Sequence, residues 1–168
     1  KIDRDDYIAF GSTQGLLHVV DADDGKEKFA FVPNEMLENA EQRKAFVKDR
    51  KGFWPDMPYG IDGAWTAYTE YAYGMGSDGK VYATVQQAKN KDIVIATGKQ
   101  ALYGGLRMGG RSYYALNLAD LDKPEIKFHI DPNTGKVYSA ANPAGQAFSA
   151  IENMGQSWSK PTIAYVNW

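Results

Sequence analysis

Residues 15–21 read Gly-Leu-Leu-His-Val-Val-Asp, and residues 111–117 read Arg-Ser-Tyr-Tyr-Ala-Leu-Asn. Each stretch is a short apolar or aromatic run that ends in Asp or Asn and follows a Gly-containing segment. In both places an apolar strand is expected before the stretch and an aromatic strand after it. These flanking strands are expected over residues 8–11, 27–32, 93–98 and 127–130. The chain therefore repeats one order of three antiparallel strands.

The repeat predicts an all-β fold of the β-propeller type. Repeated four-stranded meanders are the units of a propeller. The 168 residues include 11 Tyr and 17 Gly, which favour strands and tight turns respectively. We expect a partial propeller with about two four-stranded antiparallel blades and the start of a third. Because so few blades cannot close a ring, unpaired strand edges are expected.

The domain prediction is a single partial propeller over residues 1–168, with one inserted helix near 35–50. Asn34 is the expected N-cap of this helix, and Gly52 is placed to stop it. Further strands are expected at 64–73, 81–85, 92–97, 112–118 and 125–130. The predicted parts are a blade portion (5–33), a helix and aromatic loop insertion (34–60), a blade (61–131), and a long loop with the first strand of the next blade (132–168).

Composition excludes several classes of function. Hydrophobic residues make up 43% and charged residues 24%, which is typical of a globular domain. The net charge of -2 gives no reason to expect nucleic acid or an anionic membrane as partner. No apolar run has the length of a membrane span. The absence of Cys excludes thiol catalysis, Cys-based zinc sites and disulfides. The first residues, Lys1–Asp6, are expected to follow a cut within a longer chain.

Two Asp-containing turns, at 21–25 and 131–135, are the candidates for calcium-binding loops. A loop of the EF-hand type needs Gly at its sixth position, but here Gly25 and Gly135 occupy the fifth. We therefore predict polar turns and no metal site. The adjacent pairs Asp5-Asp6 and Asp23-Asp24 are expected to be solvated charges, because neighbouring side chains on a strand or turn diverge.

The two histidines and the Gly-rich stretch have structural interpretations. His18 and His129 each fall within an expected strand, so packing is favoured over general-base catalysis. Gly104-Gly105 and Gly109-Gly110-Arg111 resemble a phosphate cradle only superficially, because a strand and not a helix is expected next. Close backbone approach near the propeller axis is the predicted role of these glycines. No cofactor is predicted, and the chain is predicted not to be an enzyme.

An aromatic cluster around a Pro-rich loop is the candidate site of partner contact. It contains Phe53, Trp54, Tyr59 and Trp65. Loops carry binding residues, and aromatic side chains dominate interface energetics. The alternative is that the loop folds back and these rings cap the core of their own blade.

Six segments resemble the PilC/PilY family, whose members are associated with the tips of type IV pili. In order they are 11–22, 31–34 before the helix, 62–64, 104–106, 109–117 and 158–164. Together they extend across nearly the whole chain. The resemblance implies a portion of a seven-bladed propeller within a longer exported protein that also carries an N-terminal adhesive region.

The resemblance also implies a function. It predicts a non-catalytic binding module that acts in pilus biogenesis and in adhesion to surfaces or host cells. The implied partners are pilins or minor pilins, a host or surface receptor, and the rest of the parent propeller. The implied location is the outer membrane, cell surface or pilus tip of a Gram-negative bacterium. Members of the family can carry calcium, although no loop in this chain matches.

Two alternatives remain open. Residues 21–29 are similar to the blade signature of quinoprotein dehydrogenases that bind pyrroloquinoline quinone, an Asp-x-x-x-Gly-Lys turn leading to an aromatic residue. Here Phe29 replaces the usual Trp, and there is no adjacent Cys pair to pack on a quinone. The other alternative is a propeller that acts as an outer-membrane assembly scaffold.

Overall fold

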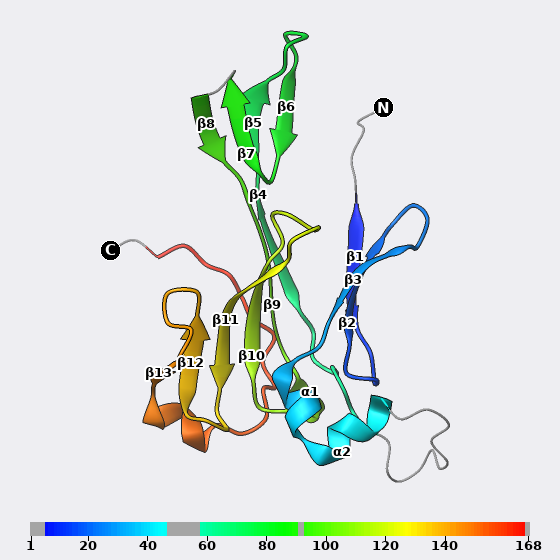
Figure 1. Cartoon of the computed structure of the whole chain (residues 1–168), viewed down its shortest axis with the longest axis vertical. Coiled ribbons are helices and arrows are strands. Elements are labelled where there is room, and N and C mark those ends of the chain that lie inside the picture. The colour runs from blue at the N-terminus through cyan, green and yellow to red at the C-terminus, as the bar shows by residue number, and fades with distance from the viewer. Residues whose placement is uncertain (1–5, 47–57, 91–92, 167–168) are drawn as a thin grey trace.

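The computed structural model describes residues 6–46, 58–90 and 93–166. Strands dominate this part of the chain and its helices are few and short, so the all-β prediction is confirmed (Figure 1). Every strand pairing is antiparallel. The described strands form one three-stranded sheet, one six-stranded sheet and two two-stranded sheets, none closed on itself. These sizes differ from four-stranded blades, and the blade count stays a prediction.

The N-terminal meander consists of β1 (Tyr7–Gly11), β2 (Leu17–Asp21) and β3 (Glu27–Phe31), in the order β1-β2-β3. These bounds agree with the predicted strands to within a residue or two. The β1–β2 turn closes where the Gly15 N–H donates to the Ser12 carbonyl at 3.0 Å. Gly15 has a φ of 82°, which most residues with a side chain avoid.

The predicted single helix over 35–50 is wrong in its described part. The structure has α1 (Asn34–Glu38), α2 (Ala40–Arg43) and the 3-10 helix η1 (Lys44–Phe46). Asn39 separates α1 from α2 with extended backbone, and its side chain accepts from the Glu41 N–H at 2.9 Å. Asn competes for backbone partners in this way and favours a new N-cap over helix continuation. Asn34 does not cap; Pro33 holds the N-cap position. Residues 47–50 and Gly52 lie outside the described residues.

The large sheet has the order β13-β12-β11-β10-β9-β4. Its strands are β4 (Thr66–Glu70), β9 (Lys99–Gly105), β10 (Tyr113–Asn117), β11 (Glu125–Asp131), β12 (Lys136–Ser139) and β13 (Gln146–Ala147). The meander β9-β10-β11 repeats the order of β1-β2-β3. The prediction that residues 93–98 begin this second unit is wrong, because β9 holds that place. Gly is depleted in strands, so the two glycines that end β9 hide its strand signal.

Residues 71–98 leave the large sheet between β4 and β9, and we call this segment the hairpin excursion. It contains β5 (Ala72–Met75), β6 (Val81–Thr84), β7 (Gln87–Asn90) and β8 (Ile93–Thr97). β5 pairs with β6, and β7 pairs with β8. Figure 1 shows these strands projecting away from the rest of the molecule. The predicted strand over 64–73 is therefore divided between β4 and β5, and β7 lies between the strands predicted over 81–85 and 92–97, where no strand is predicted.

The C-terminal part also differs from its prediction. β12, β13 and the 3-10 helix η3 (Ser149–Asn153) lie within the predicted long loop, so the predicted blade boundary at 131 falls inside the large sheet. The first strand of the next blade, which is predicted to end the segment 132–168, is absent over residues 158–166. Pro161 has no N–H to donate to a strand ladder. Its carbonyl instead accepts from the Thr66 hydroxyl at 2.6 Å.

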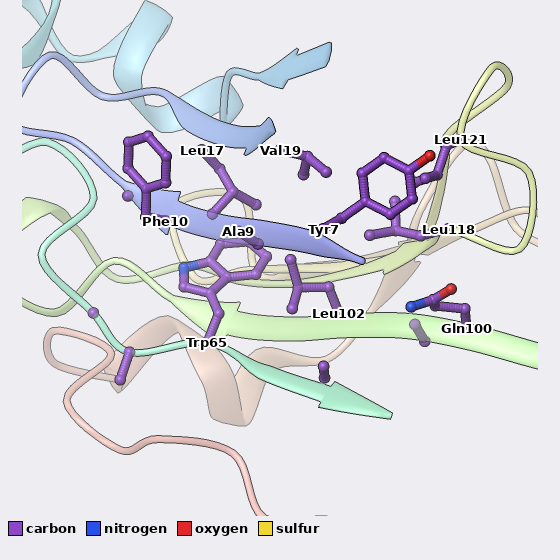
Figure 2. A pocket seen from close by; sticks show the side chains of 15 residues that line it. Tyr7, Ala9, Phe10, Leu17, Val19, Trp65, Gln100, Leu102, Leu118 and Leu121 are labelled. Carbon is purple, nitrogen blue, oxygen red and sulfur yellow. The ribbon is translucent and has the colours of Figure 1, made fainter. Parts of the chain in front are cut away.

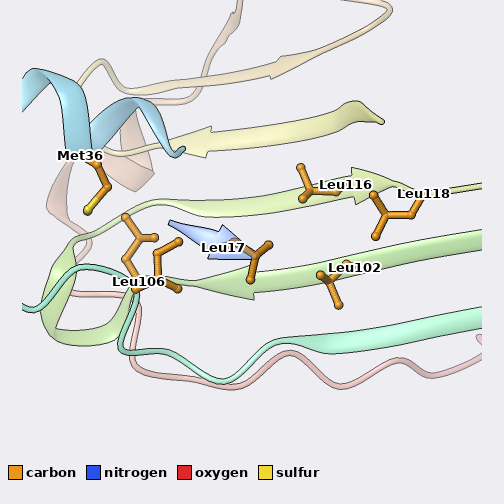
Figure 3. Packing of buried hydrophobic residues seen from close by; sticks show 7 residues of the cluster. Leu17, Met36, Leu102, Leu106, Leu116 and Leu118 are labelled. Atoms are coloured by element: carbon orange, nitrogen blue, oxygen red, sulfur yellow. The ribbon is translucent and has the colours of Figure 1, made fainter. Parts of the chain in front are cut away.

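The core lies between the N-terminal meander and the large sheet, with α1 closing one end (Figure 3). Leu17 from β2 and Met36 from α1 are both fully buried. They pack with apolar side chains from β9, from β10, from the residues just after each of these strands and from the segment before β4: Ile61, Leu102, Leu106, Leu116 and Leu118. Burial of such side chains from water is the main favourable contribution to folding.

Candidate functional site

Glycines from distant parts of the chain meet where the β1–β2 turn, residues 60–63 and the β9–β10 connection come together. A Cβ atom on Gly109 would lie 1.6 Å from the Gly60 carbonyl oxygen. A Cβ atom on Gly63 would lie 2.4 Å from the Gly105 carbonyl oxygen. Backbone therefore packs on backbone, which larger residues would prevent. We call this site the glycine hub: Gly15, Gly60, Gly63, Gly105, Gly109 and Gly110.

Glu35 binds one side of the glycine hub from α1. Its side chain is buried and its carboxylate accepts from the backbone N–H groups of Arg111 and Ser112, each at 3.0 Å. A Cβ atom on Gly110 would lie 2.5 Å from Glu35 Cδ. Hydrogen bonds from backbone N–H to a carboxylate are stronger than neutral ones. Glu35 thus fixes the residues that lead into β10.

Ser157 binds the other side. Its Oγ accepts from the Leu106 N–H at 2.7 Å and donates to the Gly110 carbonyl at 3.2 Å. The Ser157 N–H donates to the same carbonyl at 3.0 Å. Glu35 and Ser157 therefore hold the β9–β10 connection from two segments distant in sequence. Both contacts are absent from the sequence predictions, because neither residue type signals burial.

Arg111 extends this network towards the C-terminal segment. Its Nε donates to the Met154 carbonyl at 2.8 Å, and Nη1 donates to Asn133 Oδ1 at 3.0 Å. Nη2 donates to the Glu152 carbonyl. The guanidinium group thus binds two backbone carbonyls and one side-chain oxygen of the same chain.

Because β10 follows through Ser112, the predicted strand after the glycines is confirmed. Close backbone approach is confirmed at Gly109, which meets the backbone of Gly60, whereas Gly104, Gly105 and Gly110 lie mainly against the side chains of Trp65, Ser157 and Glu35. The position of these glycines near a propeller axis stays a prediction.

A mainly apolar cavity of about 360 Å³ lies beside the hub, between the N-terminal meander and the large sheet (Figure 2). β2 contributes Leu17 and Val19 to its lining, and β9 contributes Leu102. The Trp65 indole also lines the cavity, and its Nε1 has no hydrogen-bond partner among the described residues. The cavity marks where the two sheets meet without full side-chain contact.

The structure separates the described members of the predicted aromatic cluster. Trp65 is half-buried, packs against the core and meets Phe31 edge-on at a ring distance of 6.4 Å. Tyr59 is 50% exposed, beside the hub residue Gly60. Phe53 and Trp54 lie outside the described residues. Tyr59 therefore has the exposure that a contact surface needs, whereas Trp65 has the position of a core-capping ring.

Both histidines pack against aromatic rings. His18 stacks on Phe10 at 5.2 Å, and its Nδ1 lies 2.6 Å from Glu27 Oε2. His129 is buried between Tyr114 and Tyr138. Burial lowers the pKa of His129, although the nearby charges of Asp131 and Glu35 oppose the shift. The predicted packing role is confirmed for both residues.

In the two candidate calcium-binding turns, the carboxylates accept hydrogen bonds from groups of the same turn. Asp21 Oδ1 accepts from the Asp23 N–H at 2.8 Å, and Asp131 Oδ1 accepts from the Asn133 N–H at 2.9 Å. Asp131 Oδ2 accepts from the Thr134 hydroxyl at 2.8 Å. Across the described ranges, no three residues among His, Cys, Asp and Glu gather as a metal site would require. The absence of a calcium site in these turns stays a prediction.

The predicted solvated carboxylates lie in turns. Asp23 and Asp24 are exposed. The Lys26 ammonium group and backbone N–H hold the pKa of Asp24 below its usual value. Asp5 lies outside the described residues. The pair Asp23-Asp24 thus serves turn geometry.

Comparisons with known proteins find a similarity among solved structures. No family model matches the chain, and no curated protein matches it. Among solved structures, it is similar to the Pseudomonas aeruginosa PilY1 C-terminal domain, with 21% identity and a TM-score of 0.43. The match covers 76% of this chain and 19% of that chain, so this chain spans about a fifth of its length. Within the described residues, no helix has the length and apolar character needed to cross a membrane.

Proposed function

We propose that this chain forms part of a non-catalytic binding module of a type IV pilus tip-associated protein. The module acts in pilus biogenesis and in adhesion to surfaces or host cells. It resides on the outer membrane, the cell surface or the pilus tip. Its partners are pilins or minor pilins and a host or surface receptor.

The observation that supports this proposal is the spatial convergence of the family-like segments. Segments 11–22, 62–64, 104–106 and 109–117 each contribute glycines to the hub or to its immediate border. Segment 31–34 leads directly into Glu35, and segment 158–164 follows Ser157. The motifs by which the sequence resembles the PilC/PilY family therefore record one packing arrangement.

The hub gives the module a rigid frame and leaves recognition to the segments around it. Loops on a rigid β scaffold are common binding elements. We propose that Tyr59 contributes to partner contact, together with Phe53 and Trp54, which share its segment of the sequence. Trp65, the fourth member of the predicted cluster, packs against the core instead. Aromatic side chains of this kind are frequent hot spots at interfaces.

The test is binding of the immobilised chain to purified type IV pili and to purified minor pilins. We expect saturable binding to at least one of these, about tenfold weaker after Tyr59→Ala. Tyr73→Ala, which removes an equally exposed ring from the hairpin excursion, is the matched control. Failure to bind any pilin preparation would contradict the proposed function. Loss through Tyr73 alone would instead move the contact surface to the excursion.

A second assay addresses catalysis directly. The chain is incubated with pyrroloquinoline quinone, calcium, an artificial electron-accepting dye and an alcohol or sugar. We expect no dye reduction above the rate of the cofactor alone. Substrate-dependent reduction would overturn the non-catalytic proposal in favour of a quinoprotein dehydrogenase.

A further inference from the structure

β1 has an open outer edge. In the sheet order β1-β2-β3 it pairs with β2 alone. The Ser12 N–H donates to the Leu16 carbonyl at 2.9 Å, and because bonding direction alternates along an antiparallel strand, the even-numbered residues of β1 face β2. The backbone N–H and C=O groups of Tyr7 and Ala9 therefore point away from β2, and no strand of the described residues pairs with them. Both residues line the cavity of about 360 Å³ (Figure 2).

β9 holds the place in the second meander that β1 holds in the first. Leu17 and Tyr113 occupy the same position of the sequence repeat. Leu17 lies opposite Gly11 and Tyr113 lies opposite Gly105, so Gly11 corresponds to Gly105. The outer edge of β9, unlike that of β1, is paired with β4. The second meander thus has a strand that the first lacks.

Residues 162–166 correspond to β4 one unit further along the chain. A Cβ atom on Gly11 would lie 2.5 Å from the Ile61 carbonyl oxygen, and one on Gly105 would lie 2.9 Å from the Ser157 carbonyl oxygen. β4 begins five residues after Ile61, so its counterpart begins five residues after Ser157. Residues 162–166 read Thr-Ile-Ala-Tyr-Val, which favours a strand, yet they are exposed and belong to no strand.

We propose that residues 162–166 of one copy pair with the open edge of β1 in a second copy, as an added antiparallel strand. The register of β4 on β9 then gives three pairs: Thr162 with Ala9, Ile163 with Ile8, and Ala164 with Tyr7. The outward backbone groups of β1 gain hydrogen-bond partners, and strand addition of this kind is a common mode of recognition. Ile8 and Ile163, which are 53% and 39% exposed, become an apolar cross-strand pair.

The contact joins copies head to tail, because the donor segment and the acceptor edge are different parts of the surface. Figure 1 shows β1 and the C-terminal segment on opposite sides of β4 and β9, so a chain does not fill its own edge. The proposal does not depend on the pilus-related function.

Disulfide trapping between two single-cysteine variants tests the register, since the chain itself has no Cys. Full-length Ile8→Cys and Ile163→Cys, carrying tags of different mass, are mixed and oxidised. The two residues form a non-hydrogen-bonded pair with Cα atoms about 4.5 Å apart, which suits a disulfide. We expect a mixed dimer on non-reducing gels. Thr162→Cys in place of Ile163→Cys is the matched control, and about tenfold less mixed dimer is expected because neighbouring side chains point to opposite faces.

Sedimentation equilibrium tests the association itself. We expect the mass of the wild type to rise with concentration, with a Kd on the order of 100 µM. Ala164→Pro removes the N–H that donates to the Tyr7 carbonyl of the next copy, and about tenfold weaker association is expected. Ala164→Ser keeps this N–H and should associate like the wild type. Position 164 is exposed and outside the described strands and helices, so both variants should retain the wild-type circular dichroism spectrum.

Four results would overturn the proposal. A single-chain mass up to about 1 mM would leave the edge of β1 to a different partner. Preferential formation of the Ile8→Cys homodimer would show that two β1 edges pair with each other. Equal trapping of Thr162→Cys and Ile163→Cys would show contact without the proposed register. Unchanged association of Ala164→Pro would show that the backbone of residues 162–166 is not used.

Discussion

The glycine hub and the hairpin excursion use their residues in opposite ways. In the hub, backbone atoms approach so closely that a methyl group on Gly109 or Gly63 has no space. In the excursion, large apolar side chains face solvent, with Ile93 71% and Val81 67% exposed. Four of the six family-like segments contribute glycines to the hub or its border, and none lies within residues 71–98. The comparison teaches that the family-like segments coincide with the close backbone packing of the hub. The excursion has a close contact of its own, since a Cβ atom on Gly98 would lie 2.6 Å from Val85 Cα, but no family-like segment covers it.

The strongest test of this contrast is Gly109→Ala. Because the new Cβ would lie 1.6 Å from the Gly60 carbonyl, backbone must move, and we expect a loss of about 4 kcal/mol or more in unfolding free energy. Urea denaturation measures this loss. The matched control is Gly155→Ala, since nothing lies within 4 Å of a Cβ atom at that position. Equal stability of the two variants would mean that the hub is not closely packed.

The next effect concerns the carboxylate that holds the hub. Glu35→Gln preserves shape but removes the charge that accepts from two backbone N–H groups. We expect about 1–3 kcal/mol of destabilisation, together with faster hydrogen exchange at the Arg111 and Ser112 amides. Glu38→Gln, exposed on the same helix, should change stability by less than about 0.5 kcal/mol. Unchanged exchange at Arg111 and Ser112 would contradict the role assigned to Glu35.

A smaller effect should appear as a dependence on pH. Burial lowers the folded-state pKa of His129 below its ordinary value of about 6.5, so the unfolded chain binds the proton more readily. Stability from this residue is complete above pH 6.5 and declines as the pH falls towards the folded-state pKa. Thermal melts of wild type and His129→Phe between pH 8 and pH 5 isolate the contribution of His129 to the pH dependence of stability. The wild type should lose more stability than the variant, and parallel curves would refute the assignment.

The smallest effect is expected in the excursion. Ile93→Thr retains a β-branched side chain at a 71% exposed position, so unfolding free energy should change by less than about 0.5 kcal/mol. Val19→Thr makes a comparable polar change at a position that is 2% exposed, and there a loss of about 1–3 kcal/mol is expected. Chemical denaturation compares the two. A larger cost for Ile93→Thr would show that the excursion packs against another part of the molecule.

The strands that follow simple residue patterns were predictable from the sequence. The apolar residues of β2 and β10 and the turn at Asp21–Gly25 carry local signals, and the structure places them as expected. β9 lacked such a signal because Gly104 and Gly105 are chosen for close contact with Trp65 and Ser157. The strongly apolar β8 carries a clear strand signal, and for this reason the prediction places it, and not β9, as the first strand of the second unit.

The contacts that organise the candidate sites were not predictable from local pattern. Glu35 has the sequence signature of an acidic residue in a first helical turn, and only the fold brings it to Arg111. The break at Asn39 likewise depends on a side-chain capping bond that competes with a continuous helix. His129 was identified as a packing residue, but its nearness to the charge of Glu35 follows from the position of α1.

The strand register of the large sheet has a consequence for how this fold accepts new segments. Glu70 and Lys99 are direct partners across β4 and β9, and their side chains form an ion pair at 3.1 Å. Residues 71–98 therefore leave the large sheet and return to it at this single pair of partners. The entropic cost of closing a loop grows only slowly with the length of the loop, so segments of different length can replace residues 71–98 at this point. Replacing residues 71–98 with an Asn-Gly turn should leave unfolding cooperative and the β4–β9 amides protected, as hydrogen exchange would reveal.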